Sequence, residues 1–232
     1  MSGERDPLAD LVSRSVGRRI ESVAVEALPP REGVERKRLR YDTRTGPAAA
    51  IFERAPRGEA LEAQLLPFLA RKTDRVPIVH ARGIPPAHVT LGPWVLMEDV
   101  FDAPLACDGD ARDIVRAKLA IERAVAKDLP ALRALGVGDY PRVISSLASA
   151  PRGLMHGDLS CRNARRPARG VVLTSWGRAA IGPAVIDAAH FARELERAGR
   201  HTDADLVRDT WIGEAGAPGA EALWSAAQRA IN

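Results

Sequence analysis

The sequence of 232 residues is poor in cysteine, lysine and aromatic residues, and it has no long apolar run. Its two cysteines, Cys107 and Cys161, have no metal-ligand spacing and are too few for a disulfide framework, so we expect reduced thiols. Aromatic residues make up 4% of the chain, which leaves little surface for stacking on bases. The formal charge is +4, but basic residues are interleaved with Asp and Glu, so we expect no nucleic-acid binding.

The absence of long apolar segments also bears on the location of the protein. No stretch approaches the roughly 18 uncharged residues that a membrane-spanning helix needs. The N-terminal residues MSGERDPLADLV lack the basic start and apolar core of a signal peptide. We therefore expect a cytoplasmic protein with no membrane association.

Apolar periodicity predicts the elements of the first hundred residues. Pro29-Pro30 predicts a turn after the first strand. Residues 35–42 alternate arginine with Lys37, Leu39 and Tyr41, which indicates a solvated edge strand, with a phosphate-facing role as the alternative. The expected elements are a helix over 6–20, strands over 22–28, 35–42 and 48–54, a helix over 58–70, and apolar strands near 76–83 and 94–100.

The sequence of the second half of the chain predicts a mainly helical region. Residues 110–135 carry an apolar stripe, with Asp110 able to cap its start and Pro130 beginning a second helix that ends at Gly136. Residues 140–150 predict a short helix. Three more helices are expected over 187–199, 203–212 and 219–231.

The most informative stretch is 154–187, which contains His156-Gly157-Asp158, then Asn163 five positions after Asp158. An apolar run at 171–173 follows, and it leads to Ser175-Trp176-Gly177. Phosphoryl transfer needs a carboxylate to orient the acceptor hydroxyl, oxygen ligands for magnesium, and rigid positioning. Asp158 supplies the carboxylate and Asn163 supplies an oxygen ligand, and both lie in a loop that a hairpin closes.

This stretch resembles the H-G-D-x-x-x-x-N catalytic loop of the aminoglycoside phosphotransferase and choline kinase family, within the protein-kinase-like superfamily. Downstream, Gly182-Pro183 and Asp187 match further family elements. The resemblance implies an α+β, two-lobed kinase-like fold. It divides the chain into an N-lobe with a small antiparallel sheet over 1–98 and a helical C-lobe over 99–232, which carries the loop 154–163 and a hairpin to 177.

The resemblance also implies roles for individual residues. Asp158 would be the catalytic base, Asn163 a magnesium ligand and His156 a structural member of the catalytic loop. Asp187 would anchor that loop through backbone hydrogen bonds. The implied cofactors are ATP and Mg²⁺, and the implied partner is a small-molecule acceptor with a hydroxyl group.

Two positions depart from the family pattern. Ser175 stands where the family has the aspartate that bridges magnesium to the nucleotide, and a neutral hydroxyl is a poor ligand for a hard dication. Glu53 stands where the family has its phosphate-pairing lysine, whose partner on the following helix would be Glu62 or Glu59. A replacement cation could come from Arg54 or Lys37, but we expect the lysine function to be lost rather than relocated.

The segment WVLME at 94–98 resembles the family segment that links the lobes and binds adenine through its backbone, which assigns Met97 and Glu98 to the nucleotide. Acidic residues of the C-terminal helices, such as Glu194 and Asp203, are candidates for acceptor recognition, although we favour the interpretation of each as a solvated charge on a helix face. Three functions remain open. They are an ATP-dependent small-molecule phosphotransferase with impaired or atypical catalysis, a pseudokinase that binds a ligand or a protein partner, and different chemistry with the nucleotide bound in another orientation.

Overall fold

A computed structural model describes residues 7–17, 19–31, 33–86, 90–141 and 145–231. The chain divides into two compact units. Unit 1 comprises Met1–Ala63 and Pro77–Asp99, and unit 2 comprises Gln64–Val76 and Val100–Asn232. The division into two lobes after residue 98 remains a prediction. In the structure, the contacts of residues 64–76 group them with unit 2.

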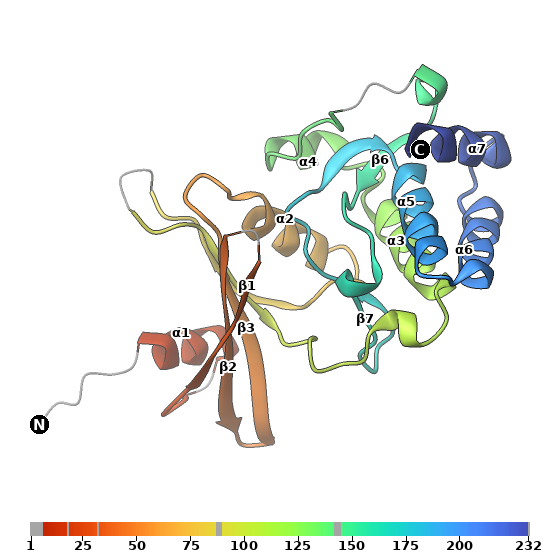
Figure 1. Cartoon of the computed structure of the whole chain (residues 1–232). Coiled ribbons are helices and arrows are strands. Elements are labelled where there is room, and N and C mark those ends of the chain that lie inside the picture. The colour runs from red at the N-terminus through yellow and green to blue at the C-terminus, as the bar shows by residue number, and fades with distance from the viewer. Residues whose placement is uncertain (1–6, 18, 32, 87–89, 142–144, 232) are drawn as a thin grey trace, which may run out of the picture. The chain divides into compact units, whose positions relative to one another are not determined.

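Unit 1 is built on an antiparallel sheet, in which Figure 1 labels β1, β2 and β3. The sheet has five strands in the order β1-β2-β3-β5-β4. The elements of unit 1 are α1 (Pro7–Val16), β1 (Ala24–Arg31), β2 (Val34–Thr43), β3 (Gly46–Arg54), β4 (Val79–Gly83) and β5 (Trp94–Glu98). The expected helix over 6–20 is confirmed in part as α1, which ends at Val16, and residues 6 and 18 lie outside the described residues.

One face of this sheet packs on α1. Val12 of α1 is buried with Leu39 of β2, Phe52 of β3 and Leu96 of β5 in one apolar cluster. Side chains alternate between the two faces of a strand, so neighbours of these residues along each strand lie on the opposite face. This alternation decides which charged residues share a face in unit 1.

The structure corrects two predictions about the first strands. β2 is not an edge strand, because it pairs with β1 on one side and β3 on the other. Its Arg38 is only 9% exposed, since the guanidinium donates to Asp99 at 2.6 Å. Pro29 and Pro30 do not make the turn but extend β1, with an irregular register between Leu28 and Arg31. β1 is an edge strand, where a missing N–H costs no sheet hydrogen bond.

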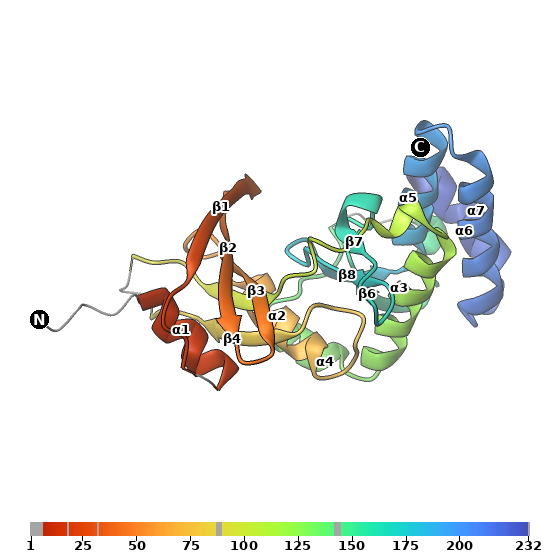
Figure 2. The ribbon, with the colours of Figure 1, turned by 90° about the horizontal axis from the view of Figure 1, so that it is seen from below.

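Unit 2 is mainly helical (Figures 1 and 2). α5 packs against α6 and α7, and α3 packs against α6. Pro130 lies in the first turn of α4, as expected. The helices are α2 (Leu61–Ala70, whose first turn falls in unit 1), α3 (Arg112–Val125), α4 (Leu129–Ala134), α5 (Val185–Arg197), α6 (His201–Glu214) and α7 (Ala220–Ile231).

Short strands and 3₁₀ turns carry the central stretch of unit 2. β6 (Arg152–Met155) pairs with β9 (Ala180–Pro183), and β7 (Ala164–Arg165) pairs with β8 (Val172–Leu173). The turns are η1 (Ala106–Asp108), η2 (Ser145–Leu147) and η3 (Cys161–Asn163). The sheet of unit 1 and the helices of unit 2 confirm the predicted α+β class.

The expectation of reduced thiols is wrong. Cys107 of η1 and Cys161 of η3 form a disulfide, with their Cα atoms 5.4 Å apart although 54 positions separate them in the sequence. This proximity arises from the folding of unit 2, which brings two distant turns together. Separately, none of the helices in the described part of the chain combines the length and the apolarity that a membrane crossing requires.

Candidate functional site

The His156–Asn163 loop begins directly after β6, and α5 fixes its backbone. The Asp187 carboxylate accepts hydrogen bonds from the backbone N–H groups of His156 at 2.5 Å and Gly157 at 3.0 Å. This is the anchoring role expected for Asp187. Gly157 has φ +79°, and a Cβ on it would lie 2.1 Å from the carbonyl oxygen of Arg178. Only glycine fits this position, so the path of the loop into Asp158 is tightly fixed.

A buried charge network lies beneath this anchor. Lys118 of α3 is 2% exposed, and its ammonium donates to the Leu154 carbonyl at 2.9 Å and to the Glu122 carboxylate, and it lies 3.2 Å from Asp187. Burial lowers the pKa of Lys118, but the two carboxylates together outweigh burial and raise it. Burial also raises the pKa of Glu122, against the opposing effect of the lysine. Lys118 therefore neutralises the charge of the residue that holds the loop.

His156 has the geometry of a structural residue. The Asp158 backbone N–H donates to its Nδ1 at 3.3 Å, which assigns the proton to Nε2, and Nε2 lies 2.8 Å from the Thr174 carbonyl. The ring packs on Trp176, with centroids 4.6 Å apart. Complete burial lowers the pKa of His156, so the ring is neutral.

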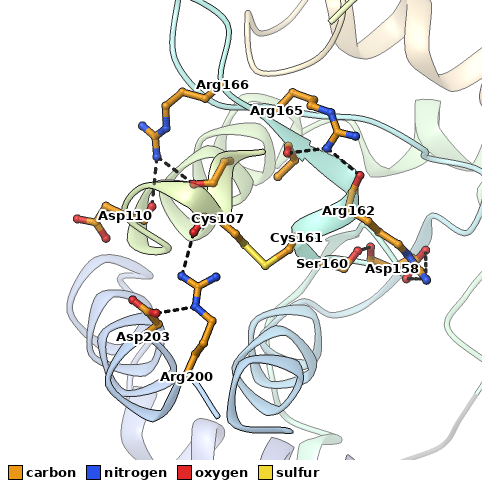
Figure 3. The surroundings of a disulfide bond; sticks show 12 residues. Cys107, Asp110, Asp158, Ser160, Cys161, Arg162, Arg165, Arg166, Arg200 and Asp203 are labelled. Atoms are coloured by element: carbon orange, nitrogen blue, oxygen red, sulfur yellow. Dashed lines mark hydrogen bonds and ion pairs between the residues drawn. A yellow bond between two sulfur atoms is a disulfide. The ribbon is translucent and has the colours of Figure 1, made fainter. Parts of the chain in front are cut away.

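The two predicted catalytic side chains meet. Asn163 is 1% exposed, and its Nδ2 donates to the Asp158 carboxylate at 3.0 Å and to the Asp158 carbonyl at 2.7 Å. Arg162 donates to both carboxylate oxygens of Asp158, at 2.9 and 3.1 Å (Figure 3). The Arg162 side chain is 69% exposed, whereas that of Asp158 is 14% exposed. Asp158 is thus held by an amide and a guanidinium, and the sequence prediction missed the second.

Among the candidates for acceptor recognition, Glu194 of α5 lies next to this loop. Its carboxylate interacts electrostatically with Arg162 and Asp158. Burial raises the pKa of Glu194, and the nearby Cys161 backbone N–H and Arg162 oppose that shift. Asp203 instead pairs with Arg200 at 2.8 Å.

Ser175 lies beside Asn163 in an unusual backbone conformation. The Thr174 N–H donates to the Asn163 carbonyl at 2.9 Å, and the Ser175 hydroxyl donates to the Thr174 hydroxyl at 3.5 Å. With φ +70°, Ser175 is the one non-glycine residue with positive φ in the described ranges. This conformation costs roughly 1–2 kcal/mol for an L-residue and is best tolerated by glycine, asparagine and aspartate.

The donor set around Ser175 does not fit a magnesium clamp. In the described parts of the chain, no three His, Cys, Asp or Glu residues form a group that could hold a metal ion. Asn163 supplies a carboxamide and Ser175 a hydroxyl, whereas Mg²⁺ is usually held through carboxylates. The chain therefore supplies Asn163 but lacks the carboxylate that the resemblance implies at position 175, so the donor set is incomplete for the metal.

The sheet of unit 1 places the candidate phosphate-pairing residues on two faces. Glu53 pairs with Arg36 across β2 and β3, with Arg36 Nε 2.7 Å from Glu53 Oε1. Lys37 pairs across the strands with Phe52, so it lies on the α1 face, as does Arg54 two positions beyond Phe52. Both contact Glu35, at 2.6 and 3.4 Å. Neither predicted replacement shares a face with Glu53; Arg36 does.

The remaining predicted nucleotide residues also lie in unit 1. Met97 is 2% exposed and pairs with Ile51. The Glu98 backbone N–H donates to the Ile78 carbonyl at 2.8 Å, and the Glu98 carboxylate accepts from the Ile78 N–H at 3.1 Å. Glu62 lies in the first turn of α2. The Glu98 N–H is thus already hydrogen-bonded within unit 1.

Comparison with solved structures identifies similar folds. A choline kinase from Cryptosporidium parvum Iowa II is 10% identical, with a TM-score of 0.57 over 90% of this chain and 74% of that one. A putative aminoglycoside phosphotransferase from Ralstonia eutropha JMP134 is 13% identical, with a TM-score of 0.56 over 89% and 79%. A thermostable mutant aminoglycoside phosphotransferase in ternary complex with AMP-PNP and hygromycin B is 12% identical, with a TM-score of 0.55 over 95% and 88%.

Sequence comparison adds no relative. No family model matches the chain, and no curated protein is significantly similar to it in sequence. The structural similarities confirm the protein-kinase-like fold that the motifs of 154–187 predict. At identities of 10–13% they show the fold alone.

Proposed function

We propose that this protein is an ATP-dependent small-molecule phosphotransferase with slow, atypical catalysis. The observation that carries the proposal is the arrangement of Asp158, which Asn163 orients and which follows a backbone anchored by Asp187. A carboxylate held this way is suited to accept the proton of an acceptor hydroxyl while the phosphoryl group is transferred. The similar structures include one with AMP-PNP and hygromycin B bound, which supports a nucleotide and a small molecule as ligands.

Slow catalysis follows from two missing groups. Transition-state charge is normally stabilised by fixed cations and metal ions, and each tenfold loss of rate corresponds to about 1.4 kcal/mol of barrier. Ser175 supplies no carboxylate for a metal, and Glu53 engages Arg36 instead of supplying a lysine. We expect turnover several decades below that of a kinase with both groups. A cytoplasmic location remains part of this proposal.

The same two departures favour a second candidate, a pseudokinase that binds a nucleotide, another ligand or a protein partner without efficient chemistry. The Arg36–Glu53 ion pair is the specific observation for it, because a phosphate would have to compete with Glu53 for the guanidinium. Nucleotide bound in another orientation is the third reading. Binding experiments with and without magnesium separate these functions.

The decisive experiment is a thermal shift with ATP, in the presence and absence of Mg²⁺, on the wild type and on Ser175→Asp. The proposed function predicts magnesium-dependent stabilisation that becomes larger in Ser175→Asp. Ser22→Asp, on an exposed residue of unit 1, is the matched control and should behave as wild type. Stabilisation by ATP that does not depend on magnesium in either protein would favour the pseudokinase or nucleotide binding in another orientation. No response to ATP would favour a protein-interaction module.

Catalysis is tested by the transfer of radiolabelled phosphate from ATP to a panel of hydroxylated and amino-sugar acceptors. Asp158→Asn keeps the shape of the side chain but removes the base, so it should abolish transfer while leaving ATP binding intact. Asp205→Asn, on an exposed position of α6, is the control. Equal transfer by Asp158→Asn and the control would rule out Asp158 as the base.

A further inference from the structure

The disulfide joins the candidate catalytic loop to a second, distant turn (Figure 3). Cys161 lies three positions after Asp158 and two before Asn163, inside the turn η3. Its partner, Cys107, lies in η1. The bond therefore acts on the segment that positions the proposed base.

The Cys107 end of the bond is firmly held within unit 2. Cys107 is 5% exposed, and its carbonyl accepts a hydrogen bond from Arg200 at 2.9 Å. Arg166 donates to the carbonyls of Ala106 and Asp110, at 3.4 and 3.3 Å, and pairs with Asp113. These contacts do not involve sulfur, so η1 keeps them when the disulfide is broken.

The Cys161 end carries the groups that surround Asp158. The next residue, Arg162, supplies the guanidinium that donates to both carboxylate oxygens. Glu194 of α5 also interacts electrostatically with Arg162. Cys161 is partly exposed, whereas Cys107 is buried, so an attacking thiolate reaches the Cys161 sulfur first.

We propose that Cys107–Cys161 is a reversible thiol–disulfide switch that sets the geometry of the His156–Asn163 loop. Two equivalents of a small-molecule thiol reduce it. The first thiolate attacks the Cys161 sulfur, and the Cys107 thiolate leaves and is protonated. The second attacks the mixed disulfide, so that the Cys161 thiol is released and the two small thiols end as their disulfide. The protein gains two electrons and two protons in all.

The two states differ in what surrounds the base. In the oxidised state, the bond to η1 holds Arg162 against the Asp158 carboxylate. In the reduced state, η3 loses its covalent tie to η1, while the backbone bridge between Leu105 and Arg165 remains, and Arg162 with its exposed side chain can leave the carboxylate. Asp158 is then available to an acceptor hydroxyl, so the oxidised protein is the less active form. This effect on rate depends on the proposed function, whereas release of the loop does not.

The switch itself is tested by equilibrating the full chain in buffers of stepped reduced-to-oxidised glutathione ratio. The chain has only two cysteines, so thiol alkylation counted by mass spectrometry reads this bond alone. Hydrogen exchange over 156–163 is measured in the same samples, with β2 of unit 1 as the internal reference. We expect half reduction within the glutathione series, and at least fivefold faster loop exchange in the reduced state with β2 unchanged.

A disulfide that stays oxidised throughout the series, or loop exchange that is equal in the two states, would overturn the proposal. The double variant Cys107→Ser/Cys161→Ser should exchange like the reduced wild type in every buffer. A variant that exchanges like the oxidised wild type would equally contradict the role of the bond.

The effect on chemistry is tested by phosphate release from ATP with water as the acceptor. We expect at least fivefold faster release from the reduced than from the oxidised wild type, and oxidised Arg162→Ala should match the reduced rate. Equal rates in the two states would overturn the proposal that the disulfide controls the access of an acceptor to Asp158. If neither state releases phosphate and no acceptor of the panel is phosphorylated, the proposed function fails, while the exchange data still decide whether the loop is switched.

Discussion

Replacing Lys118 by methionine tests the buried network that supports the candidate site. Methionine keeps the volume and apolar stem of the lysine but leaves Asp187, 3% exposed, and Glu122 without their cation, and the Leu154 carbonyl without its donor. Removing one partner of a buried ion pair costs roughly 3–5 kcal/mol, because the remaining charge stays desolvated. We expect the free energy of unfolding to fall by that amount.

For a chain of this length, each kcal/mol shifts the melting temperature by about 2–4 °C, so the expected loss is roughly 6–20 °C. Urea denaturation followed by circular dichroism gives the free energy directly. Lys127→Met, on an exposed position after α3, is the matched control and should change stability by less than about 0.5 kcal/mol. If Lys118→Met costs no more than this control, Lys118 does not compensate the charge of Asp187, and the account of the anchor is wrong.

Three further predictions concern the same unit. Cys107→Ser/Cys161→Ser should lower the free energy of unfolding by about 4 kcal/mol in urea, the chain-entropy value for opening a 54-residue loop; a loss below about 1 kcal/mol would contradict this value. Ser175→Gly, which relieves φ +70°, should raise stability by about 0.5–1 kcal/mol, whereas Ser160→Gly, at φ −159°, should lower it; equal effects would refute the strain. The pKa of His156 is lowered on folding, so the unfolded chain takes up the proton first and stability falls as pH drops below 6.5. The stability of His156→Asn should depend less on pH between pH 7 and 5 than that of the wild type. Parallel stability profiles would show that His156 is not the source of the pH dependence.

The catalytic-loop motif could be located from the sequence because its chemistry is local. His156, Asp158 and Asn163 lie within eight consecutive positions, and a short hairpin closes the segment. The anchoring role of Asp187 followed from the resemblance, and the structure confirms it with two backbone hydrogen bonds. The helices also followed from apolar periodicity, since packing one face of a helix requires that pattern.

The features that were missed depend on tertiary contacts. Lys118 occupies the apolar stripe of α3, four positions after Ile114 and four before Glu122. A charged residue within such a stripe was the available signal, but its partner Asp187 lies on another helix. The disulfide was missed for the same reason, because nothing in the spacing of two cysteines shows which turns meet. Arg36 was overlooked as the partner of Glu53 because only the strand register pairs them.

The covalent bond between η1 and η3 has a practical consequence for how the chain breaks. A protease that cuts anywhere between Cys107 and Cys161 severs the backbone, yet both fragments stay joined through sulfur. Such nicked molecules migrate as one species on a denaturing gel without reductant and as two fragments with it. Limited digestion run in these two lanes therefore reports the oxidation state of the protein as it was isolated, with no need for an activity assay.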